Sequence, residues 1–145
     1  MKACLIYFLF YLNLHVAIGQ ETNSRDHEVN HVDTLSGEPI YNSVDIIPAF
    51  PGGRKNLIRY LNKNLKYPFK ARNQKIEGRV IVQFVVDRNG LIRNVTVLEG
   101  VEETLDAEAT RVISEMPPWN PGVKNGENVN VYLILPVSFY ISVSN

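Results

Sequence analysis

The sequence predicts an α+β domain, and two observations carry that prediction. Two segments of this 145-residue chain repeat apolar residues at the spacing of an α-helix, around residues 54–66 and 105–116. Two other regions, around residues 78–98 and 129–139, are rich in β-branched and aromatic residues that favour strands. The expected order is therefore helix, short helix, β-hairpin, helix and strand.

The first helix follows a turn-forming segment at residues 48–53 and is amphipathic. Its apolar residues are Leu57, Ile58, Leu61 and Leu65, which fall on one helical face. Tyr67-Pro68 should end it, because the proline ring pushes the preceding residue out of the helical region. Pro68 can in turn start a short second helix over residues 69–75, since the first helical position needs no N–H.

A β-hairpin is expected next. The strand Gly78–Asp87 leads to Asn89-Gly90, a pair that favours a type I′ turn with positive φ at both residues. The return strand covers Leu91–Leu98. Its apolar alternation breaks near Arg93-Asn94, which predicts a β-bulge at that point.

The third helix should begin after Thr104 as N-cap and end before Pro117-Pro118. Trp119 follows it, and we expect its ring to fill the core between this helix and the sheet. The last strand is the clearest pattern in the chain, because apolar residues occupy every second position from Val129 to Phe139. One face of this strand should therefore face the core.

Pro136 lies within this last strand and marks it as an edge. Proline has no N–H, so one side of the strand should lack a neighbouring strand at that position. Such an edge can pair with another chain, or it can be covered by a terminus of the same chain. The residues alone leave both interpretations open.

The N-terminal third divides into two segments. Residues 1–19 contain one charged residue, an apolar run and a small-residue cleavage site, which is typical of a signal peptide; an uncleaved membrane anchor is the alternative. The lone cysteine, Cys4, lies inside this segment. Residues 20–47 are polar and aperiodic and are expected to form a flexible linker.

One short motif in the linker suggests an alternative function. Residues 27–31 read HEVNH and match the zinc-protease signature H-E-x-x-H. A catalytic zinc site needs a packed helix and a third protein ligand, and no histidine follows His31. We therefore interpret the match as accidental and expect no metal.

Charge and residue types also restrict the function. Residues 50–79 carry nine basic residues against Glu77 alone, which indicates a solvated basic face or an anionic partner. No base-reading motif is present, so nucleic acid is disfavoured. The predicted domain has neither histidine nor cysteine, which removes the commonest bases and nucleophiles. We therefore expect that the protein is not an enzyme and binds no cofactor.

Several motifs in this order resemble one family. They are F-P-G-G at residues 50–53, Tyr67-Pro68, Gly78 at the first long strand, residues 86–90 at the hairpin, Leu105-Asp106 with Ala109, Met116-Pro117, and W-x-P-G at residues 119–122. Together they resemble the TonB C-terminal domain family over residues 48–140. The corresponding domain is expected over residues 48–141.

This resemblance implies a fold, a compartment and a partner. The implied fold has two to three helices packed on one face of a three-stranded antiparallel β-sheet, in the periplasm. The implied partner is the TonB-box peptide of outer-membrane transporters, which pairs with the last strand. The implied partner-binding residues are Asn128, Val129, Asn130, Val131, Tyr132, Leu133 and Ile134, with Asn64, Leu65, Lys66, Tyr67 and Pro68 beside them.

The expected function is therefore support of energy-dependent transport by binding a TonB box. A chain still anchored by residues 3–19 would also contact ExbB/ExbD-type proteins of the inner membrane. The segment lacks the S-x-x-x-H pattern of a full transducer, since Tyr11 stands four residues before His15. The alternative is an unenergised periplasmic adaptor with the same fold. A homodimer through paired edge strands is a further alternative.

Overall fold

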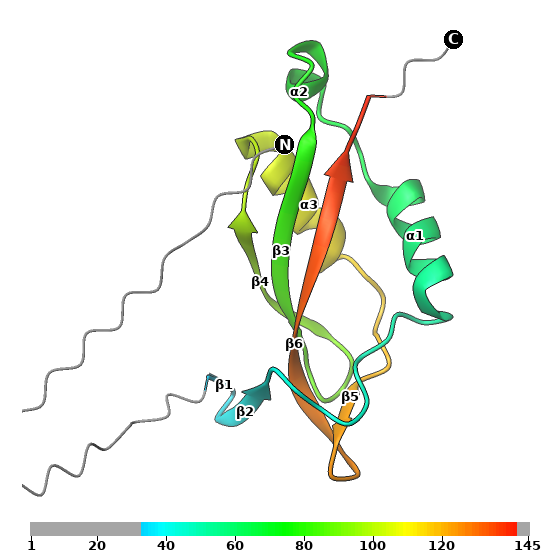
Figure 1. Cartoon of the computed structure of the whole chain (residues 1–145), viewed down its shortest axis with the longest axis vertical. Coiled ribbons are helices and arrows are strands. Elements are labelled where there is room, and N and C mark those ends of the chain that lie inside the picture. The colour runs from blue at the N-terminus through cyan, green and yellow to red at the C-terminus, as the bar shows by residue number, and fades with distance from the viewer. Residues whose placement is uncertain (1–32, 142–145) are drawn as a thin grey trace, which may run out of the picture. The chain divides into compact units, whose positions relative to one another are not determined.

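The computed structural model describes residues 33–141, so the expected signal peptide at residues 1–19 and the HEVNH motif lie outside the described part. Figure 1 shows three helices beside a twisted sheet. The elements are β1 (Thr34–Leu35), β2 (Glu38–Tyr41), α1 (Gly53–Asn64), α2 (Phe69–Asn73), β3 (Gly78–Val86), β4 (Ile92–Glu99), α3 (Glu103–Ser114), β5 (Gly122–Lys124) and β6 (Glu127–Phe139).

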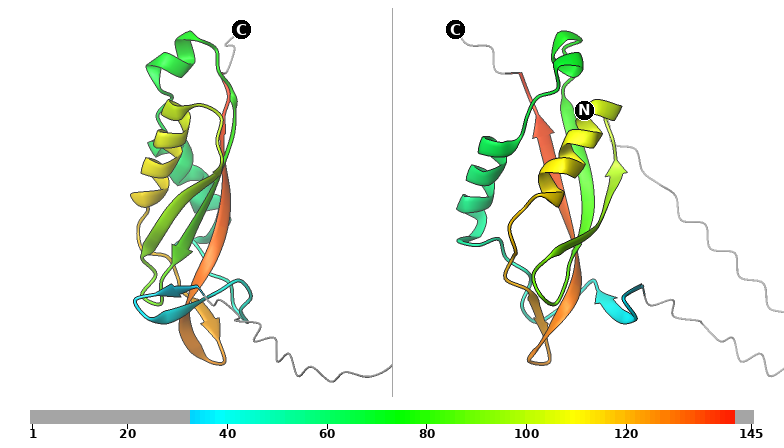
Figure 2. Two further views of the ribbon diagram at one scale, coloured as in Figure 1. Left: turned by 90° about the vertical axis from the view of Figure 1, so that its left-hand side faces the viewer. Right: turned by 180° about the vertical axis from the view of Figure 1, so that it is seen from behind.

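The predicted α+β class is confirmed, with more strands than expected. The antiparallel strands β4, β3 and β6 form the predicted three-stranded unit, with β3 in the middle. The full strand order is β1-β2-β6-β3-β4, and β5 forms a hairpin with β6. Both longer helices lie on the same face of the sheet (Figure 2).

The core lies between that face and the helices, as the periodicities predict. Val80, Val82, Phe84 and Val86 of β3 are buried against Leu105, Ala109, Val112 and Ile113 of α3. Trp119 is 7% exposed and contacts Phe50 and Phe84 edge-on, with ring centroids 5.6 and 5.7 Å away. The prediction that Trp119 fills the core is confirmed.

The β3–β4 hairpin differs from the prediction in its turn. Within the turn only Gly90 has positive φ, at 84°, so the turn is not type I′. The Asp87 carboxylate accepts hydrogen bonds from the N–H groups of Asn89 (2.8 Å) and Leu91 (2.9 Å), which stabilise a three-residue loop instead. The predicted bulge is confirmed, because the register shifts opposite Asn94, whose φ is 47°.

The helix ends also show one correction. Glu102, and not Thr104, is the N-cap of α3, because its carboxylate accepts from the Thr104 N–H at 2.9 Å. A carboxylate at this position also complements the positive end of the helix dipole. Helix α1 ends at Asn64, and the short α2 begins at Phe69 after Pro68 as expected.

The described part of the expected linker, residues 33–47, contains two short strands. β1 and β2 form an antiparallel pair within residues 33–47, and β2 pairs with β6 in parallel. Ile40 of β2 is only 6% exposed. A single buried apolar residue in a polar stretch produces no periodic signal, so the sequence pattern did not indicate this strand.

Candidate functional site

The long strand β6 has two edges, and they differ along its length. One edge pairs with β3 from Val131 to Phe139 without interruption. On the opposite side β2 pairs only with Asn130 and Val131, since β6 lies between β2 and β3 in the sheet. Among the described residues no strand pairs with this second side from Tyr132 to Phe139. We call the stretch Tyr132–Phe139 the open edge.

Pro136 fixes the direction of the backbone groups along the open edge. The register with β3 continues through the pair Ile81 and Pro136, so the position without an N–H must point away from β3. Backbone groups of alternate residues point to the same side of a strand. Ile134 and Ser138 therefore direct both N–H and C=O to the open edge, whereas Pro136 directs only its C=O there.

Helix α1 lies beside this part of β6 (Figure 1). It contains no fully buried residue, and Ile58 is 48% exposed. Leu57 and Leu61 pack only partly on the core, as do Leu133 and Leu135 of β6. The apolar side of α1 and the neighbouring half of β6 thus leave apolar surface that an added strand would cover.

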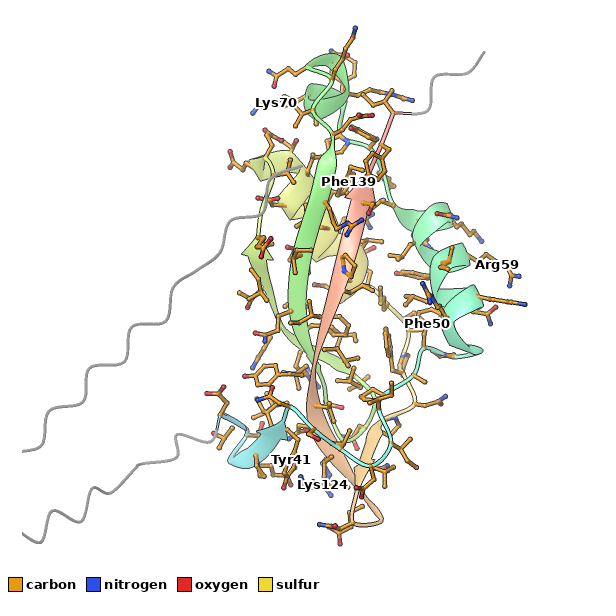
Figure 3. All side chains as sticks on the ribbon, viewed as in Figure 1. Tyr41, Phe50, Arg59, Lys70, Lys124 and Phe139 are labelled. Carbon is orange, nitrogen blue, oxygen red and sulfur yellow. The ribbon has the colours of Figure 1, made fainter. Side chains whose placement is uncertain are left out.

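The outer side of α1 is basic. Four cations and no acid lie within the helix, and Figure 3 shows Arg59 pointing away from the sheet. The cations are Arg54, Lys55, Arg59 and Lys63. Within the described residues none of them forms an ion pair, so this face is positively charged.

The lower part of β6 is held by the chain itself. The Asn130 amide is 3% exposed; its Oδ1 accepts from the Arg88 N–H at 3.0 Å. Glu38 of β2 forms an ion pair with Arg88, and the Tyr132 hydroxyl donates to Asp33 at 3.3 Å. Burial and the nearby Asp33 carboxylate raise the pKa of Tyr132 above its ordinary value.

Residues 64–68 connect α1 to α2 and contact α3. The Asn64 carbonyl accepts from Arg111 Nη2 at 2.9 Å, and the Lys66 N–H donates to Glu108 at 2.6 Å. Burial of Glu108 alone would raise its pKa, but hydrogen bonds from Arg111 and from the Lys66 N–H lower it below the ordinary value. This connection is therefore tied to α3.

Tyr67 places the connection at the C-terminal end of β6. Its ring packs edge-on against Phe139 with centroids 5.8 Å apart, and its hydroxyl donates to the Ile76 carbonyl at 2.5 Å. Phe139 lies five residues beyond Ile134, which corresponds to about 17 Å along a strand.

The predicted partner-binding residues thus separate into four groups. Asn128 and Val129 pair with β5, and Asn130 and Val131 pair with β2. Tyr132, Leu133 and Ile134 begin the open edge, while residues 64–68 lie near its far end. The prediction omitted residues 135–139, although Pro136 already indicated that the edge continues there. It also omitted Ile58 of α1.

Residues 33–141 contain no group of three or more His, Cys, Asp or Glu side chains placed to hold a metal ion. Within the same residues, no helix has the length and apolar character needed to cross a membrane.

Comparisons with known proteins complete the description. A search of curated proteins found no relative. Two solution structures of the Helicobacter pylori TonB C-terminal domain match. The shorter is 22% identical with a TM-score of 0.44 and covers 59% of this chain and 89% of its own. The longer is 20% identical with a TM-score of 0.46 and covers 65% of this chain and 89% of its own.

A family model described as the Gram-negative bacterial TonB protein C-terminal matches residues 63–141, which is more than half of the chain. This match includes β6, the open edge and Tyr67. Proteins of this family are non-enzymatic, transport-associated domains of the Gram-negative envelope. The chain belongs to the TonB C-terminal family.

Proposed function

We propose that this protein binds the TonB box of an outer-membrane transporter by β-strand addition and so supports energy-dependent transport in the periplasm. The single observation that carries the proposal is the open edge, Tyr132–Phe139, in a strand that is otherwise paired. Family membership supports the class of partner. Strand addition requires an extended peptide and an unpaired edge.

The open edge offers several hydrogen bonds to such a peptide. Ile134 and Ser138 each supply an N–H and a C=O, and Pro136 supplies one C=O. Each hydrogen bond contributes about 0.5–1.5 kcal/mol net. Side chains of the peptide that point to the helical face would cover Leu133, Leu135 and the apolar side of α1.

A second candidate function uses the same binding surface but is not coupled to energy-dependent transport. An unenergised periplasmic adaptor would bind an envelope peptide at the open edge, and it would need no contact with ExbB/ExbD-type proteins. The two functions differ at residues 1–19. An intact segment held in the inner membrane favours transduction, whereas a chain that begins at Gln20 favours the adaptor. A homodimer through the same edge would compete with peptide in both cases.

The test is an NMR titration of the isotope-labelled chain with synthetic TonB-box peptides from the same cell's transporters. Amide shifts should concentrate in residues 132–139 and around Tyr67, while the exposed outer edge of β4 serves as the internal control. A dissociation constant of about 1 mM corresponds to a binding free energy of about −4 kcal/mol. If peptide at millimolar concentration shifts neither residues 132–139 nor the surroundings of Tyr67, transporter docking is ruled out. Equal shifts along β4 would indicate unspecific strand pairing.

A further inference from the structure

Phe69 is the most exposed of the large apolar residues that the structure describes. Its side chain is 79% exposed, at the first position of α2. Helix α2 lies at one end of the sheet, opposite the end formed by β2 and β5 (Figure 1). Tyr140, just beyond β6 at the same end, is 61% exposed. Neither residue belongs to the open edge.

The geometry of α2 forces Phe69 outward. Ala71 is fully buried, and it lies about 200° around the helix from Phe69. The two residues therefore face opposite directions. Arg72, three residues after Phe69, lies on the same exposed side. The outward ring is thus a consequence of helix position, with Ala71 as the anchor to the core.

Several exposed cations at this end of the molecule have no acidic partner within residues 33–141. Within the described residues, Lys66, Arg72, Lys75 and Arg79 are exposed and form no ion pair. Lys70 is excluded from this set, because its Nζ lies 2.9 Å from Glu102. We call Phe69, Arg72, Lys75, Arg79 and Tyr140 the α2 patch.

Most acids at this end belong to other elements than the α2 patch, and Glu102 contacts α2 through its ion pair with Lys70. Glu99 ends β4, and Glu102 and Glu103 begin α3, whereas the α2 patch follows α2, the start of β3 and the end of β6. Glu77 is the acid nearest in sequence, and its carboxylate accepts the Ile141 N–H at 2.5 Å. Glu77 keeps its charge in this contact, but within residues 66–79 the four exposed cations without an ion pair outnumber it, so the α2 side is net positive.

We propose that the α2 patch docks on an anionic phospholipid surface, with Phe69 inserted among the headgroups. An exposed aromatic ring flanked by cations suits the membrane interface, where ring and charges are satisfied together. Binding of this kind needs no shape complementarity. A protein partner of comparable strength would require a fitted surface of roughly 1,000 Å² or more. The described polar hollows, lined among others by Glu38, Arg88 and Asn130, lie at the opposite end.

Docking in this way leaves the Ile134 part of the open edge accessible. Phe139 is at the α2 end of β6, and Ile134 is about 17 Å further along the strand. The inserted ring therefore lies away from the Ile134 part of the open edge, whereas Ser138, the register partner of Arg79, lies at the α2 end. The lipid contact and the proposed peptide binding can each fail without the other.

A Phe69→Trp substitution provides a local reporter in the full chain. The native Trp119 is buried, so its emission serves as a constant background. On vesicles that contain phosphatidylglycerol, the new tryptophan should shift to the blue and be quenched by brominated lipid. On phosphatidylcholine vesicles it should do neither. The matched control is Ile58→Trp on α1, which should not respond to either vesicle, even where residues 1–19 insert.

Charge variants complete the test. The double variant Arg72→Gln/Lys75→Gln should bind phosphatidylglycerol vesicles roughly 20- to 30-fold more weakly, because each lost cation lowers the affinity about fivefold. The double variant Arg54→Gln/Lys55→Gln removes the same charge from α1 and should leave the affinity for these vesicles unchanged. An unshifted emission from Phe69→Trp on phosphatidylglycerol overturns the proposal and leaves an acidic protein as the occupant. An equal response from Ile58→Trp overturns it as well, because the insertion would then not be specific to α2.

Discussion

Gly90 lies where the backbone of the β3–β4 hairpin approaches the loop after α3. Its carbonyl accepts the Trp119 N–H at 2.8 Å, and its φ is 84°. A Cβ at this position would lie 2.0 Å from the Trp119 carbonyl oxygen. The position of Trp119 in the core therefore depends on a glycine that is distant in sequence.

We predict that Gly90→Ala lowers the free energy of unfolding by about 3 kcal/mol, because backbone strain and displacement of Trp119 add together. Gly126→Ala is the control, since Gly126 has a similar φ of 79° but open space around its Cβ. Its cost should be only about 1–2 kcal/mol. Urea unfolding measures the free energy of unfolding of both variants. Equal losses would show that the backbone near Trp119 shifts to accommodate the added Cβ at little cost.

Glu102 connects α3 to α2 through charge. Hydrogen bonds from the Thr104 hydroxyl and from Lys70 lower the pKa of Glu102 to about 2, from an ordinary 4.5. The unfolded chain takes up this proton near pH 4.5, and the folded chain only near pH 2. The stabilisation is therefore present above pH 4.5 and is lost as the pH falls towards 2.

Glu102→Gln should accordingly flatten the pH dependence of stability between pH 4.5 and pH 2. Thermal unfolding across this window measures the effect. Glu103→Gln, in the same helical turn but without a hydrogen-bond partner among the described residues, should retain the wild-type slope. An unchanged slope in Glu102→Gln would place the acid sensitivity elsewhere.

At the scale of elements, β6 is both a central and an edge strand. Its N-terminal half is flanked by the chain's own strands, and its C-terminal half has one free side. Pro136 lies within the free side and removes one donor there. This arrangement limits pairing with unrelated edges, while it leaves the remaining groups available to a chosen peptide.

Pro136→Ala restores the missing donor and should tighten peptide binding about 2- to 10-fold, the value of one hydrogen bond. It should also raise the tendency to form dimers through the open edge. Calorimetric titration and sedimentation measure the two effects. Pro118→Ala, in the exposed loop after α3, is the matched control and should change neither. Unchanged affinity would mean that the peptide does not pair beyond Ile134.

At the scale of the whole described domain, α1 is attached by few contacts. Its Tyr60 hydroxyl donates to the Val112 carbonyl at 3.2 Å, and its ring contacts Phe50 with centroids 5.6 Å apart. Arg111 of α3 provides another link: it donates to the Asn64 carbonyl at the end of α1 and is held by an ion pair with Glu108 of its own helix. Hydrogen bonds from Arg111 to Glu108 raise the pKa of Arg111 above its ordinary value.

Arg111→Gln should therefore loosen α1 more than the rest of the fold. We expect a loss of about 1–2 kcal/mol in unfolding free energy, because the partners of a partly buried charge lose their donor. Hydrogen exchange should rise in residues 53–66 and stay low in β3. Arg59→Gln, on the outer face of α1, serves as the control. Equal exchange in both variants would show that aromatic packing alone holds α1.

Most of the domain could be predicted from local patterns. Alternation along residues 129–139 defined the core face of β6, and helical spacing defined α1 and α3. The break at Asn94 marked the bulge, and Pro136 marked the edge. These signals are readable because each depends on the residue's own backbone or on neighbours along the chain.

Only the tertiary structure decided which part of that edge is free. The pairing of β2 with Asn130 and Val131, the turn stabilised by Asp87 and the capping by Glu102 all depend on contacts that no local period encodes. Asn130 illustrates the reason: its pattern placed it outward, yet Arg88 and β2 bury it. The sequence by itself determined the helices, the three long strands and their faces, whereas pairing between distant segments added the short strands and decided the boundaries of the open edge.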